Sequence, residues 1–410
     1  MKTDKGRRIK VYSYNDVMTF VKEEDVKFIR LAFCDVFGKQ KNISIMPEEL
    51  KRAFTDGISF DASAITGFLD VVKSDLLLYP DPSTFSVLPW RPARGRVVRM
   101  FCDIKYPDGK PYERDARQML KRTAAEAKKK GLAFYFGSEV EFYLFKTDEE
   151  GKATKTPFDE AGYMDIAPLD KGENVRREIC LTLADMGIMP ESSHHEMGPG
   201  QNEIDFRYSG ALTAADNAVT FKSVVETIAM RNGLFADFSP KPLENFPGNG
   251  MHINMSVKSE NAKDYTEQFI AGILEHISEM TLFLNNCDAS YNRLGQMKAP
   301  KYITWSKQNR SQLIRIPAAK GEYARIELRS PDPAANPYIA YTLLIKAGIE
   351  GITRGLKLAP AVNENLYCAD KTLLDGLKKL PSSKEEAYLC AKKSSFIKEA
   401  LPEGILEQYK

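Results

Sequence analysis

Carboxylates alternate with apolar residues in the segment GSEVEFYLF, residues 137–145. In a β-strand, residues two positions apart lie on the same face, roughly 6–7 Å from each other. Glu139 and Glu141 therefore share one face, while Val140 and Phe142 lie on the other and are expected to pack under helices. Such a strand must place its charged face in water or against compensating groups.

Three further segments show the same alternation: QNEIDFRY (201–208), GMHINMS (250–256) and ARIELRS (324–330). Each one alone would indicate a strand with one solvated face, the usual meaning of such a pattern. Together with 137–145 and the loop before residue 201, their polar faces gather five glutamates and a histidine: Glu139, Glu141, Glu196, Glu203, Glu327 and His252. So many carboxylates on one face of a sheet would repel each other and raise each other's pKa.

Bound divalent cations would remove this conflict, because carboxylates with a neutral imidazole suit Mg²⁺ or Mn²⁺. Arginines on the same face suit phosphates and substrate carboxylates. The residue types therefore predict phosphoryl transfer with more than one metal ion, in which positioning and charge neutralisation carry most of the catalysis. The chain has no G-x-x-x-x-G-K-[ST] motif, so it is not a P-loop enzyme.

The remaining histidines have plainer interpretations. His194 and His195 directly precede Glu196 and are expected to position that loop rather than to bind a metal ion. His276 lies in an amphipathic helical stretch and is expected to be structural.

Composition excludes several classes of protein. With 58 Lys and Arg against 56 Asp and Glu, the net charge is +2, which argues against a nucleic-acid or membrane-surface protein. No apolar stretch approaches the length of a bilayer span. The six cysteines have no C-x-x-C spacing, so we expect reduced thiols in a cytoplasmic protein.

The length of 410 residues favours two domains. Residues 80–110 are dense in proline and glycine, so the boundary is placed near residue 105, between domains 1–105 and 106–410. The first domain is expected to contain a strand at 26–38 and a helix at 45–57. The second begins with a helix at 113–130 and continues with polar-faced strands among helices at 172–187, 212–234, 263–286 and 334–357.

These segments, in this order, resemble the class I (bacterial-type) glutamine synthetases. The resemblance covers most of the chain from about residue 25 to 370 and rests on the following stretches: FDASAITGF (60–68) with SDLLLYPDPSTF (74–85), GSEVEFYLF, HHEMGPGQNEIDFRY (194–208), LTAADNAVTFK (212–222), GNGMHINMS (248–256), NRSQLIRIP (309–317) and RIELRSPDPAANPY (325–338).

The resemblance implies an α+β fold. A small N-terminal β-grasp-like domain would precede a large catalytic domain with a curved antiparallel sheet flanked by helices. It also implies a homo-hexamer or dodecamer whose active sites lie between neighbouring subunits. The partners would be small molecules, namely glutamate, ATP and ammonium, with no nucleic acid and no membrane.

The resemblance further implies a role for each matching residue. At least two Mg²⁺ or Mn²⁺ ions would be bound at each site, one by Glu141, Glu196 and Glu203, and the other by Glu139, His252 and Glu327. Glutamate would be held by Glu141, Gly248, Arg293 and Arg329, and ATP by Ser256, Arg315 and Arg325. The catalytic residues would be Glu196, Arg310, Tyr163 near the ammonium, and Asp61 lent by the adjacent subunit.

The reaction implied is the formation of γ-glutamyl phosphate from ATP and L-glutamate, followed by attack of ammonia to give glutamine. This agrees with the chemistry expected from the residues alone, because metal ions would bridge phosphates, arginines would absorb charge and a carboxylate would take a proton from the amine.

Several positions depart from the family's pattern. Lys298 stands where the family's flap carries a glutamate before an Ala-Pro pair, and a cationic lysine cannot act as a base and repels NH₄⁺. Alternatively, Lys298 points to solvent, the flap still closes, and Asp61 and Glu196 suffice to deprotonate the amine. Pro247, Ala62, Ala64 and Asn254 also replace the usual residues. Two alternatives follow: a γ-glutamyl ligase for another amine, or a weakly active regulatory homologue. The presence of Asp61, Glu196 and Tyr163 favours ammonium, and Lys298 alone supports the regulatory alternative.

Overall fold

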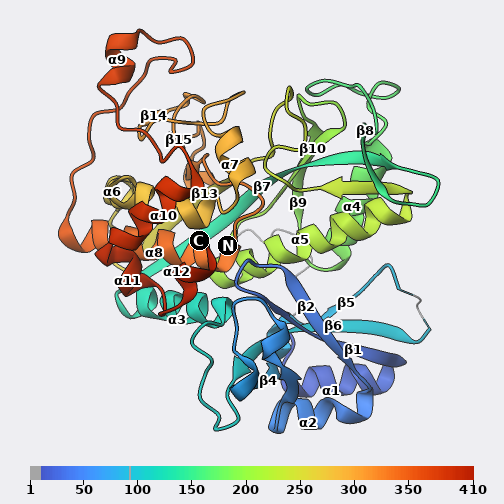
Figure 1. Ribbon diagram of the computed structural model, residues 1–410. Coiled ribbons are helices and arrows are strands. Elements are labelled where there is room, and N and C mark those ends of the chain that lie inside the picture. Colours follow the sequence, from blue (N-terminus) through green and yellow to red (C-terminus); the bar gives the residue numbers. More distant parts are fainter. Residues whose placement is uncertain (1–10, 92–93) are drawn as a thin grey trace.

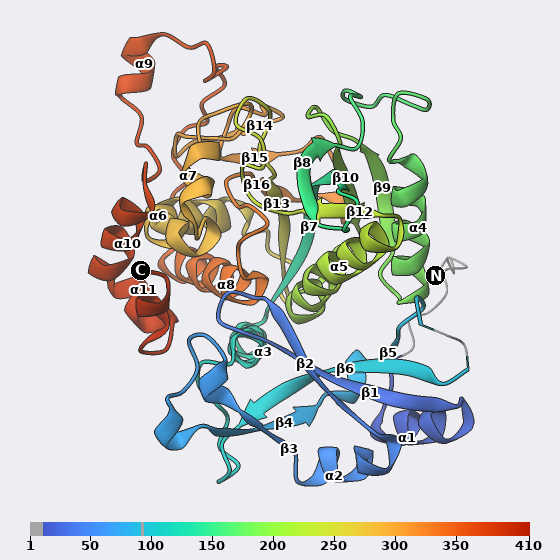
Figure 2. The same ribbon diagram turned by 45° about the vertical axis from the view of Figure 1, so that its right-hand side comes forward.

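The computed structural model describes residues 11–91 and 94–410 of the chain. A smaller N-terminal part, blue to cyan in Figures 1 and 2, lies beside a larger part that holds most of the helices. Each part is built on its own sheet, of six and ten strands respectively within the described residues. Both parts combine a sheet with helices, which agrees with the α+β class expected from the sequence.

The N-terminal sheet has the order β2-β1-β6-β4-β3, with β5 pairing to β6. Its elements are α1 (Tyr14–Glu23), β1 (Val26–Cys34), β2 (Gln40–Ile45), α2 (Leu50–Thr55), β3 (Ile58–Asp61), β4 (Asp75–Pro80), β5 (Ser86–Val87) and β6 (Arg96–Lys105). Helices α1 and α2 contribute apolar side chains to the core on one face of this sheet. Ala32, Cys34 and Phe101 on its other face belong to the core of the larger part, so the two parts share apolar packing.

The strand expected at 26–38 ends earlier, at Cys34. Asp35 begins a turn in which the amide of Gly38 donates to its carbonyl at 3.0 Å, and Gly38 has a φ of +78°. Glycine adopts this left-handed conformation without steric cost, so the turn is local and tight. The helix expected at 45–57 begins as a 3₁₀ turn at Pro47–Glu49 and continues as α2.

The larger sheet has the order β14-β15-β16-β13-β7-β10-β9, and β8, β11 and β12 also pair with β7. All of its pairings are antiparallel except that of β14 with β15. The strands are β7 (Leu132–Thr147), β8 (Ala153–Pro157), β9 (Pro190–His195), β10 (Gln201–Phe206), β11 (Ser209–Gly210), β12 (Leu234–Asp237), β13 (Met251–Ser259), β14 (Trp305–Lys307), β15 (Ile314–Ile316) and β16 (Ile326–Leu328).

Helices pack on the apolar face of this sheet, as the alternation predicts. They are α3 (Ala116–Lys129), α4 (Glu173–Asp185), α5 (Ala211–Arg231), α6 (Thr266–Leu284) and α8 (Pro337–Arg354). The short helix α7 (Asp288–Arg293) follows α6. Val140, Phe142, Ile204 and Ile253 are buried in the resulting core. The four long helices predicted in this part are confirmed, and their ends differ by no more than about three residues, the usual scatter at helix termini. Among the described residues, no helix combines the length and apolar character that a membrane span requires.

The C-terminal segment returns to the junction between the two parts. It contains α9 (Lys371–Asp375), α10 (Lys384–Lys393), α11 (Ser395–Ala400) and α12 (Ile405–Gln408). Tyr409 is buried, and its hydroxyl donates to the carbonyl of Val36 at 2.7 Å. Its ring lies 4.8 Å from that of Phe283 and 5.1 Å from that of Phe37. This tyrosine therefore links the C-terminus to both parts.

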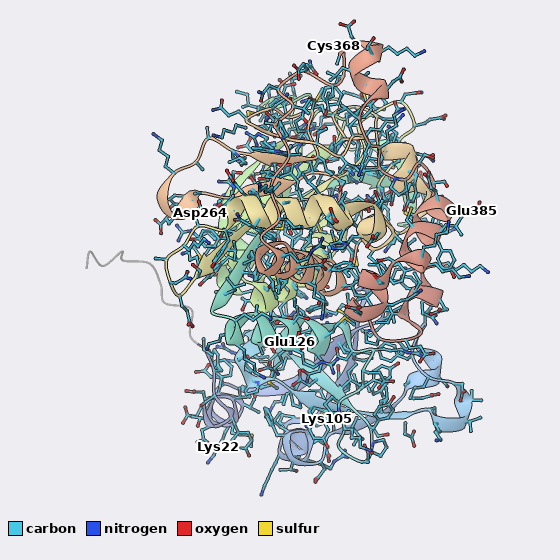
Figure 3. All side chains as sticks on the ribbon, turned by 90° about the vertical axis from the view of Figure 1, so that its left-hand side faces the viewer. Lys22, Lys105, Glu126, Asp264, Cys368 and Glu385 are labelled. Carbon is cyan, nitrogen blue, oxygen red and sulfur yellow. The ribbon has the colours of Figure 1, made fainter. Side chains whose placement is uncertain are left out.

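A buried arginine also joins the two parts. Arg117, on α3, donates to Asp216 on α5 at 2.9 Å and to Asp81 and Asp103 of the N-terminal part at 3.0 and 3.2 Å. In Figure 3, Lys22 and Lys105 lie in the lower, N-terminal part, and Glu126 on α3 lies just above it. The domain boundary near residue 105 stays a prediction. β6 ends at Lys105, and α3 begins at Ala116.

Candidate active site

The register of the larger sheet brings like charges into direct opposition. Glu203 on β10 lies opposite Glu141 on β7, and Asp205 lies opposite Glu139. On the other side of β7, His252 of β13 also lies opposite Glu139. Like charges in direct cross-strand contact are destabilising, so this face needs compensating positive charge.

One end of this face is compensated by arginines, and we call it the arginine-paired end: Glu139, His252 and Glu327 with Arg315 and Arg329. Glu327 is 1% exposed, accepts a hydrogen bond from Arg315 at 2.6 Å and also pairs with Arg329. Burial acts to raise the pKa of Glu327, but the charges of Arg329, His252 and Arg315 outweigh it and lower that pKa. Burial also acts to raise the pKa of Glu139. Contacts with His252, Asn254 and Arg329 outweigh this effect and lower that pKa to about 2.

The other end has no arginine partner of this kind among the described residues, and we call it the acidic end: Glu141, Glu196, Glu203 and Asp205. Burial and the charges of Asp205 and Glu141 raise the pKa of Glu203 well above its ordinary value. Burial and the charge of Glu141 raise the pKa of Glu196 to about 7. Burial and the charge of Glu139 raise the pKa of Asp205 to about 6. Glu196, Glu203 and Asp205 are therefore poorly stabilised as anions by the chain alone.

Both ends contain groups of side chains that could hold a metal ion, with potential ligand atoms within 4.8 Å of one another: Glu139, His252 and Glu327; Glu141, Glu203 and His252; His194, Glu196 and Glu203; and Glu139, Glu203 and Asp205. Carboxylate oxygens and imidazole nitrogens suit Mg²⁺ and Mn²⁺. The residues present therefore fit the predicted metal ions, because bound cations would supply the charge that the acidic end lacks.

The structure gathers one of the two predicted ligand sets, Glu139 with His252 and Glu327, into a single group. The members of the other set lie in two groups that share Glu203, one with Glu141 and one with Glu196. Which residues bind which ion stays a prediction.

These side chains border a cavity of about 490 Å³. Most of the residues predicted to form the site line it: Glu139, Glu141, Tyr163, Glu196, Glu203, Gly248, His252, Arg293, Arg310, Arg315, Arg325 and Arg329. Glu327 is buried beside the cavity, where it holds Arg315 and Arg329. Segments far apart in the sequence thus meet at one concave site, the usual setting of a small-molecule site.

The loop before β13 forms one wall of the cavity. The amide of Gly250 donates to Glu141 at 2.7 Å, and the carbonyl of Gly248 accepts from Gln201 at 3.2 Å. A Cβ at Gly248 would lie 2.2 Å from the carbonyl oxygen of Pro240 and 3.0 Å from Arg293. Only glycine fits at this close approach, which leaves the backbone of the loop facing the cavity.

Both of the predicted glutamate-binding arginines are anchored to the backbone or to Glu327. Arg293 is buried, and it donates to the carbonyls of Ser330 at 2.8 Å and Arg329 at 3.3 Å. Arg329 is held by Glu327. Their guanidinium groups are therefore fixed before any ligand binds, which reduces the entropic cost of binding an anion.

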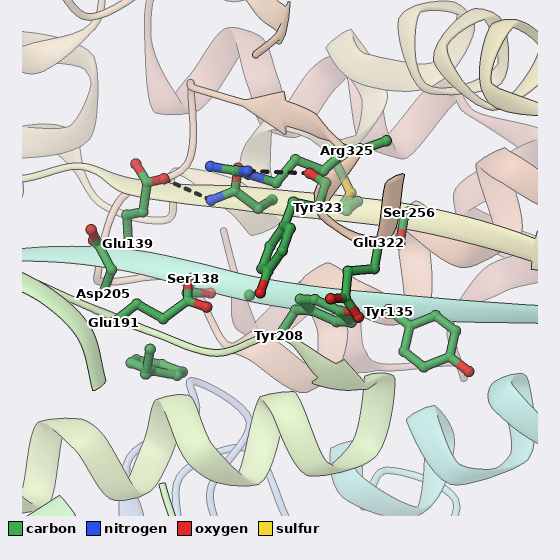
Figure 4. A pocket seen from close by; sticks show the side chains of 15 residues that line it. Tyr135, Ser138, Glu139, Glu191, Asp205, Tyr208, Ser256, Glu322, Tyr323 and Arg325 are labelled. Atoms are coloured by element: carbon green, nitrogen blue, oxygen red, sulfur yellow. Dashed lines mark hydrogen bonds between the residues drawn. The ribbon is translucent and has the colours of Figure 1, made fainter. Parts of the chain in front are cut away.

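A second pocket adjoins the first, and Glu139, Asp205 and Arg325 line both. Figure 4 shows Glu139 and Asp205 at one end of this pocket and Tyr135 and Ser256 at the other. Asn254 lines the second pocket and joins two residues shared by both cavities, since it donates to Glu139 at 2.8 Å and accepts from Arg325 at 2.8 Å. Ser256 and Arg325, both predicted to contact ATP, thus lie together, whereas Arg310 and Arg315 line only the first cavity.

Asp61 lies apart from the rest of the predicted site. It ends β3 in the N-terminal part and does not line the cavity of its own chain. Its carboxylate is exposed and accepts hydrogen bonds from the amide and hydroxyl of Ser63 at 2.9 and 2.6 Å, which lower its pKa.

The two histidines before Glu196 differ from each other. His195 is buried, contacts Asp159 at 2.8 Å and accordingly positions the loop, as expected. His194 lies 3.3 Å from Glu203 and belongs to a candidate metal group, which the sequence interpretation did not favour. Its position on β9, opposite Glu203 on β10, could have been inferred only from the strand pairing. His276 stacks on Phe396 at 4.0 Å and is structural, as expected.

Comparison with known proteins agrees with this geometry. Residues 25–107 match the family described as glutamine synthetase, beta-Grasp domain, and residues 113–410 match glutamine synthetase, catalytic domain. A glutamine synthetase of Clostridium saccharobutylicum is 43% identical over 97% of this chain and 93% of its own length. A glutamine synthetase of Methanosarcina mazei is 45% identical over 96% of this chain and 92% of its own length.

Among solved structures, GmaS in complex with ADP superposes with a TM-score of 0.87 at 27% identity, covering 96% of this chain and 94% of GmaS. The N-terminal match confirms the β-grasp-like domain expected from the sequence. From its residues, its fold and these similarities, the chain belongs to the glutamine synthetase family.

Proposed function

We propose that the chain is a glutamate–ammonia ligase, which uses ATP to join ammonia to the γ-carboxylate of L-glutamate through γ-glutamyl phosphate. One observation carries this proposal: in a member of the glutamine synthetase family, described residues of a single cavity include carboxylates, two histidines and five arginines. The first two groups suit metal ions, and the arginines suit phosphate and carboxylate groups.

The residues that would hold Mg²⁺ or Mn²⁺ are Glu139, Glu141, Glu196, Glu203, His252 and Glu327. Bound there, the ions would neutralise phosphate charge and supply electrophilic stabilisation. His194 is an additional candidate ligand because of its distance to Glu203.

The arginines would bind and orient the anionic substrates. Arg293 and Arg329, whose guanidinium groups are already fixed, would hold the carboxylates of glutamate. Arg310 and Arg315 would stabilise negative charge on the transferred phosphoryl group. Ser256 and Arg325, in the adjoining pocket of Figure 4, would contact the nucleotide.

Tyr163, Glu196 and Asp61 would receive the amine. An aromatic ring and a carboxylate attract a small cation, and a carboxylate can accept its proton before attack. Because Asp61 lies outside its own chain's cavity, we propose that it completes the site of a neighbouring subunit in a homo-hexamer or dodecamer. The exposed Val71 and Val72, in the loop after β3, would be covered by such an assembly. We further propose a cytoplasmic location, which the six free cysteines support.

The activity is tested by measuring glutamine and phosphate released from ATP and glutamate with ammonium, methylammonium, a polyamine or no amine. We expect glutamine with ammonium and much weaker turnover with the other amines. Preference for a bulkier amine would instead indicate a γ-glutamyl ligase for another amine. Nucleotide binding without turnover would indicate a regulatory homologue.

The shared site is tested by co-expressing two inactive variants, Asp61→Ala and Arg329→Met. The Asp61→Ala variant keeps its own cavity intact. The Arg329→Met variant keeps Asp61, which it would contribute to the site of a neighbouring subunit. At equal amounts in a closed ring, about a quarter of the sites pair an intact cavity with an intact aspartate, so activity should recover to about that fraction. Absence of recovery in mixed oligomers would refute the shared site.

A further inference from the structure

One lysine lines the cavity near Tyr163. Lys298 belongs to the segment 295–300, in which Met297 and Lys298 have positive φ angles of 42° and 74°. Non-glycine residues rarely adopt this left-handed conformation. The turn presents an exposed lysine at the edge of the cavity, which carboxylates and arginines line.

The ammonium group of Lys298 is directed at the ring of Tyr163. Its Nζ lies 5.4 Å from the ring centre, within the range of a cation–π interaction. The same ring packs edge-on against His194, with 5.5 Å between the ring centres. The charge of Lys298 also reaches Glu196, since it opposes the effect of burial and of Glu141 on the pKa of that carboxyl.

An aromatic face beside a carboxylate is an attractive position for any small cation. Under the proposed function, the amine substrate is ammonium, which is a small cation in neutral solution until it loses a proton. Lys298 and that substrate are therefore drawn to the same groups, and two like charges so close together repel each other.

We propose that Lys298 is a specificity-determining residue whose tethered ammonium group competes with the cationic amine substrate for the position beside Tyr163 and Glu196. This inference rests on the proposed function. The lysine raises the concentration of ammonium that the enzyme needs. It disfavours larger cationic amines still more, since they must displace it completely. An uncharged nucleophile does not compete with it electrostatically, so its apparent affinity does not depend on the charge at residue 298.

The test compares wild-type protein with Lys298→Met at saturating glutamate and ATP, varying either ammonium or hydroxylamine, which is mostly uncharged at neutral pH. Removing the charge should lower KM for ammonium about fivefold, equivalent to about 1 kcal/mol, with kcat changed less than about twofold. KM for hydroxylamine should stay the same. Lys298→Arg keeps the charge and should keep the wild-type KM for ammonium.

Lys301→Met is the matched control, because this lysine is exposed in the same part of the chain but does not line the cavity. It should leave both KM values unchanged. The inference is overturned by an unchanged or higher KM for ammonium in Lys298→Met, by an equal fall for hydroxylamine, or by a large loss of kcat. If the wild-type chain forms neither glutamine from ammonium nor γ-glutamyl hydroxamate from hydroxylamine, both the proposed function and this inference are refuted. If the enzyme is active but Lys298→Met leaves KM for ammonium unchanged, only the inference is refuted.

Discussion

Glu327 and Glu203 are buried carboxylates on two strands of the same sheet, yet their pKa values move in opposite directions. Burial acts on both, but Arg329, His252 and Arg315 lower the pKa of Glu327, whereas Asp205 and Glu141 add to burial and raise that of Glu203. At the arginine-paired end, the chain itself therefore supplies positive charge that stabilises the carboxylates. The acidic end is complete only when something else brings positive charge to it.

This difference separates two tasks on one surface. Arginines that are already fixed by Glu327 and by backbone carbonyls hold their geometry without a ligand. Carboxyls that lack such partners are poorly stabilised as anions until a metal ion binds, at a cost in stability to the metal-free protein. Substitutions at the two ends should consequently act on stability with opposite signs.

The largest effect is expected for Glu327→Gln. This change leaves Arg315 and Arg329 without their buried anionic partner, so the free energy of unfolding should fall by about 3 kcal/mol or more. Denaturant unfolding of the metal-free protein measures it, with the exposed Glu149→Gln as a control of equal charge change. A loss no larger than that of the control would show that the arginines do not depend on Glu327.

Addition of Mn²⁺ or Mg²⁺ should stabilise the wild-type protein, because the ions bind the folded acidic end. At a metal concentration of about 100 Kd, one such site adds about 2.7 kcal/mol to the free energy of unfolding. Calorimetric titration and thermal unfolding in the presence of a chelator or of each metal measure this gain. If neither ion binds, even with nucleotide present, the acidic end has no metal function.

Much of this arrangement follows from local sequence. Alternation in GSEVEFYLF and the three related segments placed the carboxylates on one face and the apolar residues under helices, because strand periodicity is a local property. The long helices were equally predictable from their apolar spacing.

The contrast between the two ends could not be predicted from spacing. It depends on which strands are neighbours and in what register, and register is set by long-range packing and turns. His194 illustrates this: only the pairing of β9 with β10 brings it beside Glu203. The position of Asp61 could not be predicted from spacing either. Residues 60–68 resemble the family, but within a single chain this carboxylate lies outside the cavity.

A smaller effect of opposite sign is expected for Glu203→Gln. Gln removes a carboxyl that is buried among like charges, so the metal-free protein should gain about 1–2 kcal/mol in stability. The same variant should lose most of the stabilisation by metal, since Glu203 belongs to three of the candidate metal groups. A less stable metal-free variant, or one with an undiminished response to metal, would contradict the assignment of Glu203 to the acidic end.

The smallest effect tests the connection between the arginine-paired end and the adjoining pocket. Asn254→Ala removes the hydrogen bonds to Glu139 and Arg325, so stability should fall by about 1 kcal/mol. Because Arg325 then loses a fixed partner beside the proposed nucleotide pocket, KM for ATP should rise several-fold while KM for ammonium changes little. Asn261→Ala, at an exposed turn, is the control. Equal behaviour of the two variants would mean that Asn254 does not couple the cavities, and that Arg325 is positioned by its contact with the carbonyl of Tyr323.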